Sequence, residues 1–521
     1  MKSINIGLIG WGTIGCGVVK LLQDNEKLIE KKLDAKLVLK KIADIDIKTP
    51  RPVKISKNIL TINAREVLQD KNIDIIIELI GGYEPARTFL LEAIAQGKQV
   101  VTANKALLAT HGNEIFQAAQ KNGINIGFEA SVGGTIPIIK TLKESLVANK
   151  INSIFGIMNG TANFILTKMT DEGKDFDVVL KEAQKLGYAE ADPTYDIEGV
   201  DTAHKLAITL SLAYGCRVKL NDIFHEGISA ISRQDVIFAR ELGYRIKLLA
   251  IAILHNVVVE ARIHPTMIPS DHLLANVNRN YNAFHLIGDA SGPVFLYGQG
   301  AGMMPTASAV VSDVIDIARE LIKGISGRVP LRSINESLLE DINLMPIDDI
   351  ETKRVLQVFA EEAGRETLVK RFGLDERLVA EFGRILGISS ICNIIGAIKT
   401  AKYYEMGADD VIVTIATDGM DRYHTVMADM ARTYGSMDEA EATATIRGLL
   451  QWQKTDWIKR GTPENRRQWH NLKYYTWVEQ QGKTVEELNA QLSQQWWIEH
   501  QQLVGEIDAR LLAWRKEHPI V

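Results

Sequence analysis

The chain has 521 residues, of which 46% are hydrophobic and 24% are charged, and its formal net charge is −5. One hydrophobic core rarely serves more than about 250–300 residues, so this length predicts several domains. The near-balanced charge excludes a strongly basic surface, and we expect neither a nucleic-acid nor a membrane partner. The 3 cysteines stand at unrelated spacings, which indicates a reducing, cytoplasmic compartment and neither a disulfide framework nor a zinc site.

The first 130 residues alternate apolar, β-branched segments with helical ones, which is the pattern of a parallel sheet covered by helices. We therefore predict an α/β fold with a Rossmann-type, doubly wound parallel sheet over residues 1–130. A helical segment is expected over residues 13–33. The predicted strands are residues 4–9, 36–43, 73–79, 99–102 and 124–128.

The next region, residues 131–323, mixes helical segments with apolar strand-like runs, which predicts an α+β domain. A helix is expected over residues 177–186, and strands over residues 248–254 and 257–263. A long helix at residues 305–323 ends the region, and we expect it to return to the first domain.

The remainder of the chain has a different character. Residues 324–354 contain prolines and acidic residues without a sustained period, which predicts a connector. Residues 355–521 predict a mainly helical C-terminal extension, with one strand at residues 410–416. Seven of the eight tryptophans lie after residue 450, so the end of the chain differs in composition from its beginning.

A glycine-rich turn follows the first predicted strand and opens the first helix. Gly10, Gly12 and Gly15 have the spacing G-x-G-x-x-G, with Thr13 and Ile14 between the last two. Such glycines permit a tight turn, the close approach of a pyrophosphate and close helix–strand packing, and the helix N-terminus attracts the phosphate charge. The turn therefore predicts a dinucleotide site, with a purely structural turn as the alternative.

The residues after the second strand bear on which dinucleotide binds. Asp44 closes that strand, where a carboxylate binds the ribose 2′-hydroxyl of NAD. Lys48 and Arg51 follow closely and could instead pair with the 2′-phosphate of NADP. The sequence leaves the choice between NAD and NADP open.

An acidic segment supplies the candidate for chemistry. Five carboxylates fall within residues 190–201, from Glu190 to Asp201, and Lys205 follows. Asp201 and Lys205 are four residues apart, so on a helix they share one face. A lysine held beside a carboxylate at a domain cleft can exchange a proton with a substrate hydroxyl while hydride passes to a nicotinamide. The alternative is a solvated loop whose ion pair is worth only about 0.3–0.5 kcal/mol.

Two further segments are candidates for ligand binding. Lys105 follows the strand at residues 99–102, at the edge of the sheet where ligands of such folds bind, and could hold a carboxylate or polarise a carbonyl. A plain helix-start lysine is the alternative. Residues 129–137 form a glycine-containing loop with one carboxylate and several free carbonyls, which suits a hard cation. A simple interdomain turn is the competing interpretation of this loop.

Eight stretches match one family in order, over about 350 residues: 7–17, 78–82, 101–107, 129–137, 156–164, 187–193, 198–207 and 297–306. On these stretches the chain resembles homoserine dehydrogenase. The resemblance implies reversible NAD- or NADP-dependent oxidation of L-homoserine to L-aspartate 4-semialdehyde, a step in threonine, methionine and isoleucine biosynthesis. It also implies that residues 131–323 form the catalytic domain and join two subunits into a homodimer.

The resemblance also implies roles for particular residues. By match to the family, Lys205 is the proton donor or acceptor, Glu190 and Asp201 are substrate ligands, and Lys105 is a second lysine near cofactor and substrate. The predicted cofactor-binding residues are Gly10, Gly12, Thr13, Ile14, Gly15, Asp44, Thr102, Lys105, Gly187 and Gly302. The predicted sodium-binding residues are Glu129, Val132, Gly134 and Ile136, of which Val132 and Ile136 contribute backbone carbonyls.

The family pattern stops near residue 353, where many members begin a ligand-sensing domain that this sequence does not show. From about residue 355 the chain resembles the C-terminal part of a cysteine synthase-like pyridoxal-phosphate enzyme, on residues 386–402 and 411–423. The half that would carry the Schiff-base lysine is missing, so we do not expect pyridoxal phosphate here. The leading hypothesis is a homoserine dehydrogenase with an atypical extension. The alternative is a nucleotide-binding regulatory protein, or a fusion, whose extension binds a partner.

Overall fold

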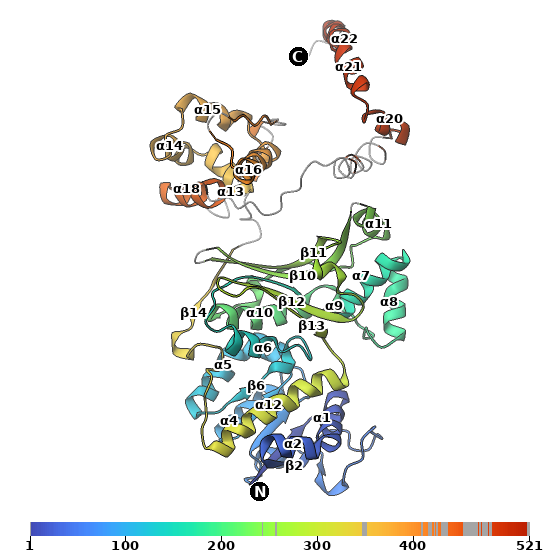
Figure 1. Ribbon diagram of the computed structural model, residues 1–521, viewed down its shortest axis with the longest axis vertical. Coiled ribbons are helices and arrows are strands. Elements are labelled where there is room, and N and C mark those ends of the chain that lie inside the picture. Colours follow the sequence, from blue (N-terminus) through green and yellow to red (C-terminus); the bar gives the residue numbers. More distant parts are fainter. Residues whose placement is uncertain are drawn as a thin grey trace. The chain divides into compact units, whose positions relative to one another are not determined.

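The computed structural model describes residues 2–241, 243–255, 258–345, 352–407, 410–414, 419–420, 423, 426–428, 436–451, 467, 470, 478 and 482–517. The chain divides into two compact units, Met1–Ile350 and Glu351–Val521 (Figure 1). The division falls inside the segment predicted as a connector. The candidate site lies wholly in the first unit, so that unit is described in more detail.

The first unit begins with a parallel sheet whose strand order is β3-β2-β1-β4-β5-β6. Residues 6–9 of β1 and all of β4 are buried, and the side chains of both segments are apolar except for Glu78. Strand order reverses between β1 and β4, and ligands of such sheets bind beside the carboxyl ends at this point. The strands are β1 (Lys2–Ile9), β2 (Ala35–Ala43), β3 (Leu60–Thr61), β4 (Ile75–Glu78), β5 (Gln99–Thr102) and β6 (Ile126–Gly127).

Helices cover this sheet, and the helical segment predicted over residues 13–33 is confirmed as two consecutive helices. Asn25 leaves the helical conformation, with φ −110° and ψ 15°, and separates two helices. The helices are α1 (Thr13–Asp24), α2 (Glu26–Leu33), α3 (Ala64–Leu68), α4 (Ala86–Ala95) and α5 (Lys105–Asn122), with the 3-10 turn η1 (Lys57–Ile59).

The helix expected to return from the second region does so as α12 (Met303–Lys323), which lies beside α1 (Figure 1). Val18 and Val19 of α1 share one buried core with Val310 and Val314 of α12. The approach is close, because a β-carbon at Gly17 would lie only 2.6 Å from the Met303 carbonyl oxygen. The two ends of the dehydrogenase-like region are thus packed into one body.

The second region contains a mixed sheet in the order β13-β12-β7-β10-β11-β15, with β9 paired to β11. This confirms an α+β region. Its strands are β7 (Ile151–Ile157), β9 (Phe224–His225), β10 (Tyr244–His255), β11 (Val258–Pro269), β12 (Tyr281–Gly288), β13 (Gly292–Gln299) and β15 (Asn343–Met345). Its helices are α6 (Ile138–Lys140), α7 (Gly160–Glu172), α8 (Phe176–Lys185), α9 (Thr194–Ile197), α10 (Val200–Tyr214) and α11 (Arg233–Glu241). Short turns are η2 (Glu129–Ser131), η3 (Thr141–Ser145), η4 (Leu220–Asp222) and η5 (Leu273–Asn276).

The predicted connector is more ordered than its sequence suggested. After α12 it forms η6 (Glu336–Leu338) and then β14 (Glu340–Asp341), which pairs with β8 (Cys216–Arg217). It continues as β15, which extends the mixed sheet beside β11. Residues 324–345 therefore belong to the body of the first unit.

In the described part of the second unit, the helices from α13 to η9 surround a small core that includes Val355, Phe359 and Ile391. The predicted strand at residues 410–416 is wrong over residues 410–414, which have no regular secondary structure, and residues 415–416 lie outside the described residues. Trp497 is 47% exposed, whereas four of the late tryptophans lie outside the described residues. The elements are α13 (Thr352–Ala360), α14 (Glu362–Lys370), α15 (Glu376–Ile385), α16 (Ile388–Tyr403), α18 (Glu439–Thr445), η9 (Ile446–Gln451), α20 (Val485–Ala490), α21 (Gln494–Gln502) and α22 (Val504–Glu517). Among the described residues of both units, no helix is long and apolar enough to cross a membrane.

Candidate active site

The glycine turn between β1 and α1 is required by close backbone packing. Gly10 has φ +103°, and a β-carbon there would lie 2.7 Å from the Leu79 carbonyl carbon. A β-carbon at Gly15 would lie 2.3 Å from the Gly10 carbonyl oxygen. Around Gly12, by contrast, no described atom lies within 4 Å of such a carbon. The first and third glycines thus serve the fold, while the second leaves room at the N-terminus of α1, where a pyrophosphate is favoured.

A cavity of about 850 Å³ opens beside this turn. Its walls come from the carboxyl ends of β1, β2 and β4 and from the loops that follow them. The lining includes Gly10, Gly12, Asp44, Arg51, Gly81 and Glu84. Pockets of roughly 300–1,000 Å³ hold drug-sized ligands and cofactors, so the cavity fits the dinucleotide predicted from the glycine turn.

Asp44 and Arg51, the residues predicted to discriminate NAD from NADP, both line this cavity and lie close together. The Asp44 carboxylate accepts hydrogen bonds from the backbone N–H groups of Trp11, at 2.5 Å, and Asp46, at 2.8 Å. The Arg51 guanidinium lies 3.5 Å from the Asp46 carboxylate, 4.0 Å from that of Asp44, and 5.8 Å from the ring centre of Trp11. Both candidate contacts, a carboxylate and a cation, are therefore present.

Asp201, in the first turn of α10, is the centre of a buried charge cluster. One carboxylate oxygen accepts a hydrogen bond from Lys205 Nζ at 2.6 Å, and the other pairs with Lys105 Nζ at 2.8 Å. The four-residue spacing therefore places Asp201 and Lys205 together, as predicted, and the strand-end lysine joins them. The Lys205 side chain is 10% exposed and that of Lys105 is 42% exposed, so the cluster has one buried and one accessible ammonium group.

Burial and charge act in opposite directions within this cluster. Burial favours the protonated form of Asp201, but the two lysines outweigh it and hold the pKa of that carboxyl well below its usual range. Burial lowers the pKa of the Lys205 ammonium, with Asp201 opposing this effect and Lys105 adding to it. Asp201 raises the pKa of Lys105. A lysine with a lowered pKa, next to a fixed carboxylate, is suited to transfer a proton.

Two residues that the sequence did not single out complete the cluster. Asn159 caps α7 through its side-chain oxygen, and its amide nitrogen donates to Asp201 at 2.8 Å and to Asp196 at 2.7 Å. Lys205 also donates to the Met158 carbonyl oxygen at 2.7 Å. In the sequence, Asn159 stands directly before the glycine that starts a helix, a position typical of a helix cap. That position does not predict the hydrogen bonds of its amide nitrogen to Asp201 and Asp196.

The other residues predicted to bind substrate or cofactor make no described contact with Asp201 or Lys205. Glu190 is exposed, and its charge contributes to the raised pKa of Lys105 without a described contact to Lys205. Gly187 has φ +75° in open surroundings, and Gly302 precedes α12 with φ +127°. Thr102 is fully buried, and its hydroxyl donates to Glu78 at 2.6 Å. The Thr102 hydroxyl therefore donates its hydrogen bond to another side chain of the protein.

Glu78 is a buried residue that the sequence did not assign a role of its own. Its carboxylate accepts hydrogen bonds from the backbone N–H groups of Ile80, at 2.8 Å, and Gly81, at 3.2 Å, in the loop that lines the cavity. Through Thr102 it is also connected to Asn104, which caps the helix that begins with Lys105. Burial raises the pKa of the Glu78 carboxyl. The network fixes the cavity loop and the start of α5 relative to each other.

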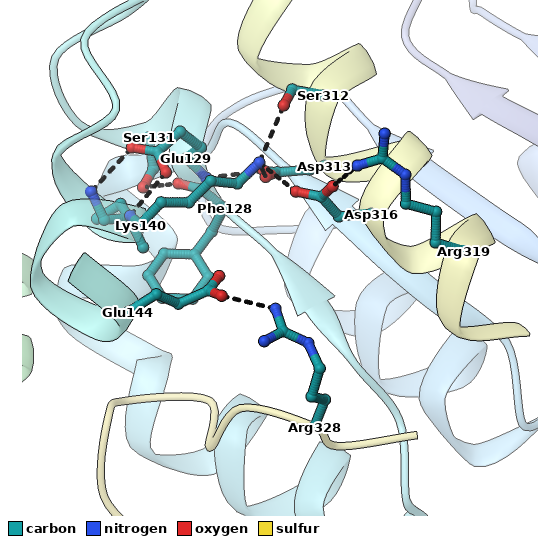
Figure 2. A network of polar contacts seen from close by, with 11 residues as sticks. Phe128, Glu129, Ser131, Lys140, Glu144, Ser312, Asp313, Asp316, Arg319 and Arg328 are labelled. Carbon is teal, nitrogen blue, oxygen red and sulfur yellow. Dashed lines mark hydrogen bonds and ion pairs between the residues drawn. The ribbon is translucent and has the colours of Figure 1, made fainter. Parts of the chain in front are cut away.

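The predicted cation loop lies against α12 (Figure 2). The Glu129 carboxylate accepts hydrogen bonds from the backbone N–H groups of Ile139, at 2.8 Å, and Lys140, at 2.9 Å, and its own N–H donates to Asp313 at 2.8 Å. Figure 2 shows the Lys140 ammonium between Ser312, Asp313 and Asp316 of that helix. Burial and the proximity of Asp313 raise the pKa of Glu129 to about 7.

The loop itself is tightly built. A β-carbon at Gly134 would lie 2.5 Å from the Gly300 carbonyl, and the Ile136 carbonyl accepts a hydrogen bond from Ile138 at 2.8 Å. Within the described residues, no protein donor is bonded to the carbonyls of Val132 and Gly134, which fits the predicted oxygen donors. No group of three or more His, Cys, Asp or Glu side chains in the described parts of the chain could hold a metal ion. A cation here would therefore need backbone oxygens in addition to the Glu129 carboxylate.

A Rossmann-type sheet with its glycine turn and cavity, joined to a buried lysine–carboxylate pair, defines a nicotinamide-nucleotide-dependent oxidoreductase. Two family models match the chain: "Homoserine dehydrogenase, NAD binding domain" over residues 10–129 and "Homoserine dehydrogenase" over residues 137–315. The chain belongs to the homoserine dehydrogenase family. It is an NAD(P)-dependent oxidoreductase of amino-acid biosynthesis with a small-molecule substrate.

Relatives and solved structures agree with this assignment. The homoserine dehydrogenase of Pseudomonas aeruginosa is 44% identical over 363 residues, which cover 70% of this chain and 83% of that protein. That of Bacillus subtilis is 36% identical over 458 residues, 88% of this chain and its own whole length, so this similarity continues beyond residue 353. The crystal structure of a homoserine dehydrogenase from Thiobacillus denitrificans is 47% identical, with a TM-score of 0.63 over 67% of this chain and 81% of that one.

Proposed function

We propose that Lys205 exchanges the hydroxyl proton as the enzyme interconverts L-homoserine and L-aspartate 4-semialdehyde. When homoserine is oxidised, the neutral amine of Lys205 accepts the proton of the substrate hydroxyl, and in the reverse direction the ammonium returns it. The bound nicotinamide supplies the redox chemistry by accepting or donating hydride. The observation that carries the proposal is the buried Lys205 ammonium, held at 2.6 Å by Asp201 and at 2.7 Å by the Met158 carbonyl.

We assign the charged residues around Lys205 different roles in binding the amino-acid substrate. Asp201 is 3% exposed and has three donors already, so we assign it to orienting Lys205 and Lys105. The exposed Glu190 is then the ligand for the substrate ammonium, and the accessible Lys105 binds the substrate carboxylate or the forming carbonyl. This division predicts that Glu190→Gln raises KM for homoserine more than it lowers kcat.

For the cofactor, we propose that Arg51 contacts the 2′-phosphate of NADP and Asp44 contacts the ribose of NAD, so that both dinucleotides are used. Both side chains line the cavity, and the Arg51 side chain is 20% exposed. A solved hyperthermophilic archaeal homoserine dehydrogenase, 26% identical with a TM-score of 0.51 over 60% of this chain and 97% of that one, is in complex with NADPH. Arg51→Gln should lower kcat/KM for NADP by about tenfold, the loss of roughly one charge-assisted hydrogen bond, and change that for NAD little.

Two accompanying proposals follow from the family resemblance and are tested separately. Sodium bound by the carbonyls of Val132 and Gly134 should raise the melting temperature in sodium chloride above that in choline chloride at equal ionic strength. A homodimer is consistent with β13, an edge strand of the mixed sheet on which Tyr297 is 54% exposed. Light scattering on the purified chain measures its oligomeric state.

The mechanism is tested by homoserine-dependent reduction of NAD and NADP with Lys205→Ala. General acid–base catalysis contributes about 10²- to 10⁴-fold, so kcat should fall by that factor while the KM for the dinucleotide stays near the parent value. Lys20→Ala is a matched control, because Lys20 and Asp24 form an exposed helical pair with the same four-residue spacing at 2.9 Å. Parent-like turnover by Lys205→Ala would overturn the proposal.

A further inference from the structure

The two helices that carry Lys105 and Asp201 lie side by side beyond their ion pair. α5 starts at Lys105, and α10 has Asp201 in its first turn. A small cavity of about 50 Å³ lies between the facing sides of the helices and is lined by Gly112 and Phe116 of α5 and by Ala207 and Ser211 of α10. The helices therefore run together for about eight residues past the ion pair, roughly 12 Å at 1.5 Å per residue.

Arg332, from the segment after α12, joins these helices at the end remote from the ion pair. Its guanidinium donates to Asn113 Oδ1 of α5 at 2.6 Å and to Ser211 Oγ of α10 at 3.3 Å. It also lies 5.0 Å from the ring centre of Phe116 on α5. A single planar group with several fixed donors thus contacts both helices, a geometry that lysine cannot reproduce.

The charge of Arg332 is neutralised inside the protein. Its side chain is 5% exposed and is bonded by two nitrogens to the carboxylate of Glu336, which is 4% exposed. Buried ion pairs add little net stability, because the desolvation of both charges is costly, but they impose a definite geometry when every donor is used. The site at Arg332 therefore fixes positions more than it adds to stability.

Neighbouring residues of the same segment rest on the same two helices. Ile334 packs at the end of α10, where a β-carbon at Gly215 would lie 2.0 Å from Ile334 Cδ1. Asn335 accepts a hydrogen bond from Gln120, near the end of α5, at 2.5 Å. Residues 332–336 therefore form a clamp, which we name the Arg332 clamp, across the C-terminal halves of both helices.

We propose that Arg332 is a positioning residue for the dehydrogenase reaction: it holds α5 and α10 in the register that brings Lys105, Asp201 and Lys205 together. The inference rests on the function proposed above. Leu107 of α5 and Ala207 of α10 belong to one buried apolar core, but apolar packing is non-directional and does not by itself fix the register of the two helices. A second polar attachment about 12 Å along fixes this register, and a displacement of about 1 Å at a reacting group can cost roughly 100-fold in rate.

The experiment compares three variants in the full chain. Arg332→Lys keeps the positive charge but loses the planar guanidinium with its several fixed donors. The double variant Arg332→Met with Glu336→Gln removes both buried charges. Arg217→Gln is the control. Arg217 forms an exposed pair with Asp341 of the same segment, at 3.5 Å. We expect kcat to fall about 10- to 100-fold in both Arg332 variants and less than about twofold in the control. The KM for the dinucleotide should stay within about twofold in all three, because the glycine turn lies on α1.

The pH profile separates positioning from a general loss of structure. Loosening the contact of Lys105 and Asp201 should shift the pH dependence of kcat/KM for homoserine in the Arg332 variants, whereas a partly unfolded enzyme would lose amplitude without a shift. Parent-like kcat and pH profile in a folded double variant would overturn the role of Arg332. Parent-like turnover by Lys205→Ala would instead overturn the proposed function, so the two failures are distinguishable.

If the Arg332 variants do not fold, Asn113→Ala decides the question. It removes the hydrogen bond from Arg332 to α5 and leaves the contacts of the clamp with Phe116, Gln120 and Glu336 in place. A severalfold fall in kcat with an unchanged melting temperature supports the clamp. An unchanged kcat for this variant overturns it.

Discussion

Neutralising Asp201 and removing Lys105 should shift the pH dependence of homoserine oxidation in opposite directions. Burial lowers the pKa of Lys205, Asp201 opposes that effect, and Lys105 adds to it. Asp201→Asn therefore lowers the pKa of Lys205 further, whereas Lys105→Met raises it. In oxidation the neutral amine is the active form, so the rate rises with pH and levels off above this pKa. The rising limb should move to lower pH in Asp201→Asn and to higher pH in Lys105→Met.

The distances in the cluster set the size of these shifts. Lys205 Nζ lies 2.6 Å from the Asp201 carboxylate. Unit charges at that separation interact by about 1.6 kcal/mol in water and by about 6 kcal/mol at an effective dielectric constant of about 20. Because about 1.4 kcal/mol corresponds to one pH unit, the limb of Asp201→Asn should move by roughly one unit or more. The Lys105 side chain is 42% exposed, so solvent screens it and its removal gives the smaller shift.

The assay is kcat/KM for homoserine as a function of pH, at saturating dinucleotide, for the parent and both variants. Asp24→Asn is the matched control, because it neutralises the carboxylate of an exposed pair with the same spacing and should leave the profile unchanged. Shifts of both variants in the same direction, or coincidence of all profiles, would show that the cluster does not set the protonation of the catalytic base.

Three other predictions concern the fold around the site. Burial and Asp313 raise the pKa of Glu129 from 4.5 to about 7, so the folded state binds the extra proton and the free energy of unfolding should fall as pH rises through this window. Urea unfolding of Glu129→Gln should lack this fall of about 3 kcal/mol, and an unchanged slope would contradict the assignment. Gly12→Val should weaken dinucleotide binding at least tenfold in a fluorescence titration and leave the melting temperature parent-like, because a β-carbon at Gly12 meets no described atom. Gly15→Ala should lower the melting temperature, because its β-carbon would lie 2.3 Å from the Gly10 carbonyl oxygen. Equal melting temperatures of the two variants would contradict the assignment of Gly15 to close backbone packing. Residues 1–353 should retain turnover and residues 1–323 should lose it, since only the longer chain keeps the Arg332 clamp; activity in the shorter chain would count against the clamp.

Local rules predicted the parts of the site that depend on short spacings. The four-residue separation of Asp201 and Lys205 became a 2.6 Å contact, and the strand-end position of Lys105 brought it within 2.8 Å of the same carboxylate. Asn159 and Arg332 were not found because their partners lie far along the chain, 42 residues away for Asn159 and 219 for Arg332 with Asn113. A single polar residue in a loop carries no periodic signal of such a contact.

The differences between the predicted and the observed fold have the same origin. Residues 411–414 are all β-branched, which favours a strand, yet among the described residues no other strand lies beside them to complete a sheet. Val411 and Val413 are 80% and 88% exposed. Asn25 separates α1 from α2, although most residues on both sides of it favour a helix, because a single residue outside the helical region is enough to end one. The residue types of a segment indicate which secondary structure it can form, and its neighbours in the folded protein decide whether that structure forms.

The ordered path of residues 324–345 has a consequence for how such a chain can be assembled from modules. The family models end at residue 315, but β14 and β15 extend the same body to Met345, and the compact unit closes at Ile350. Every contact described for the site lies before that residue. A different C-terminal module joined there leaves the active centre unchanged, whereas one joined directly after α12 replaces residues on which the catalytic helices rest. We therefore expect the fusion point that preserves this dehydrogenase to be set by β15 and to lie beyond α12, the helix in which the family model ends.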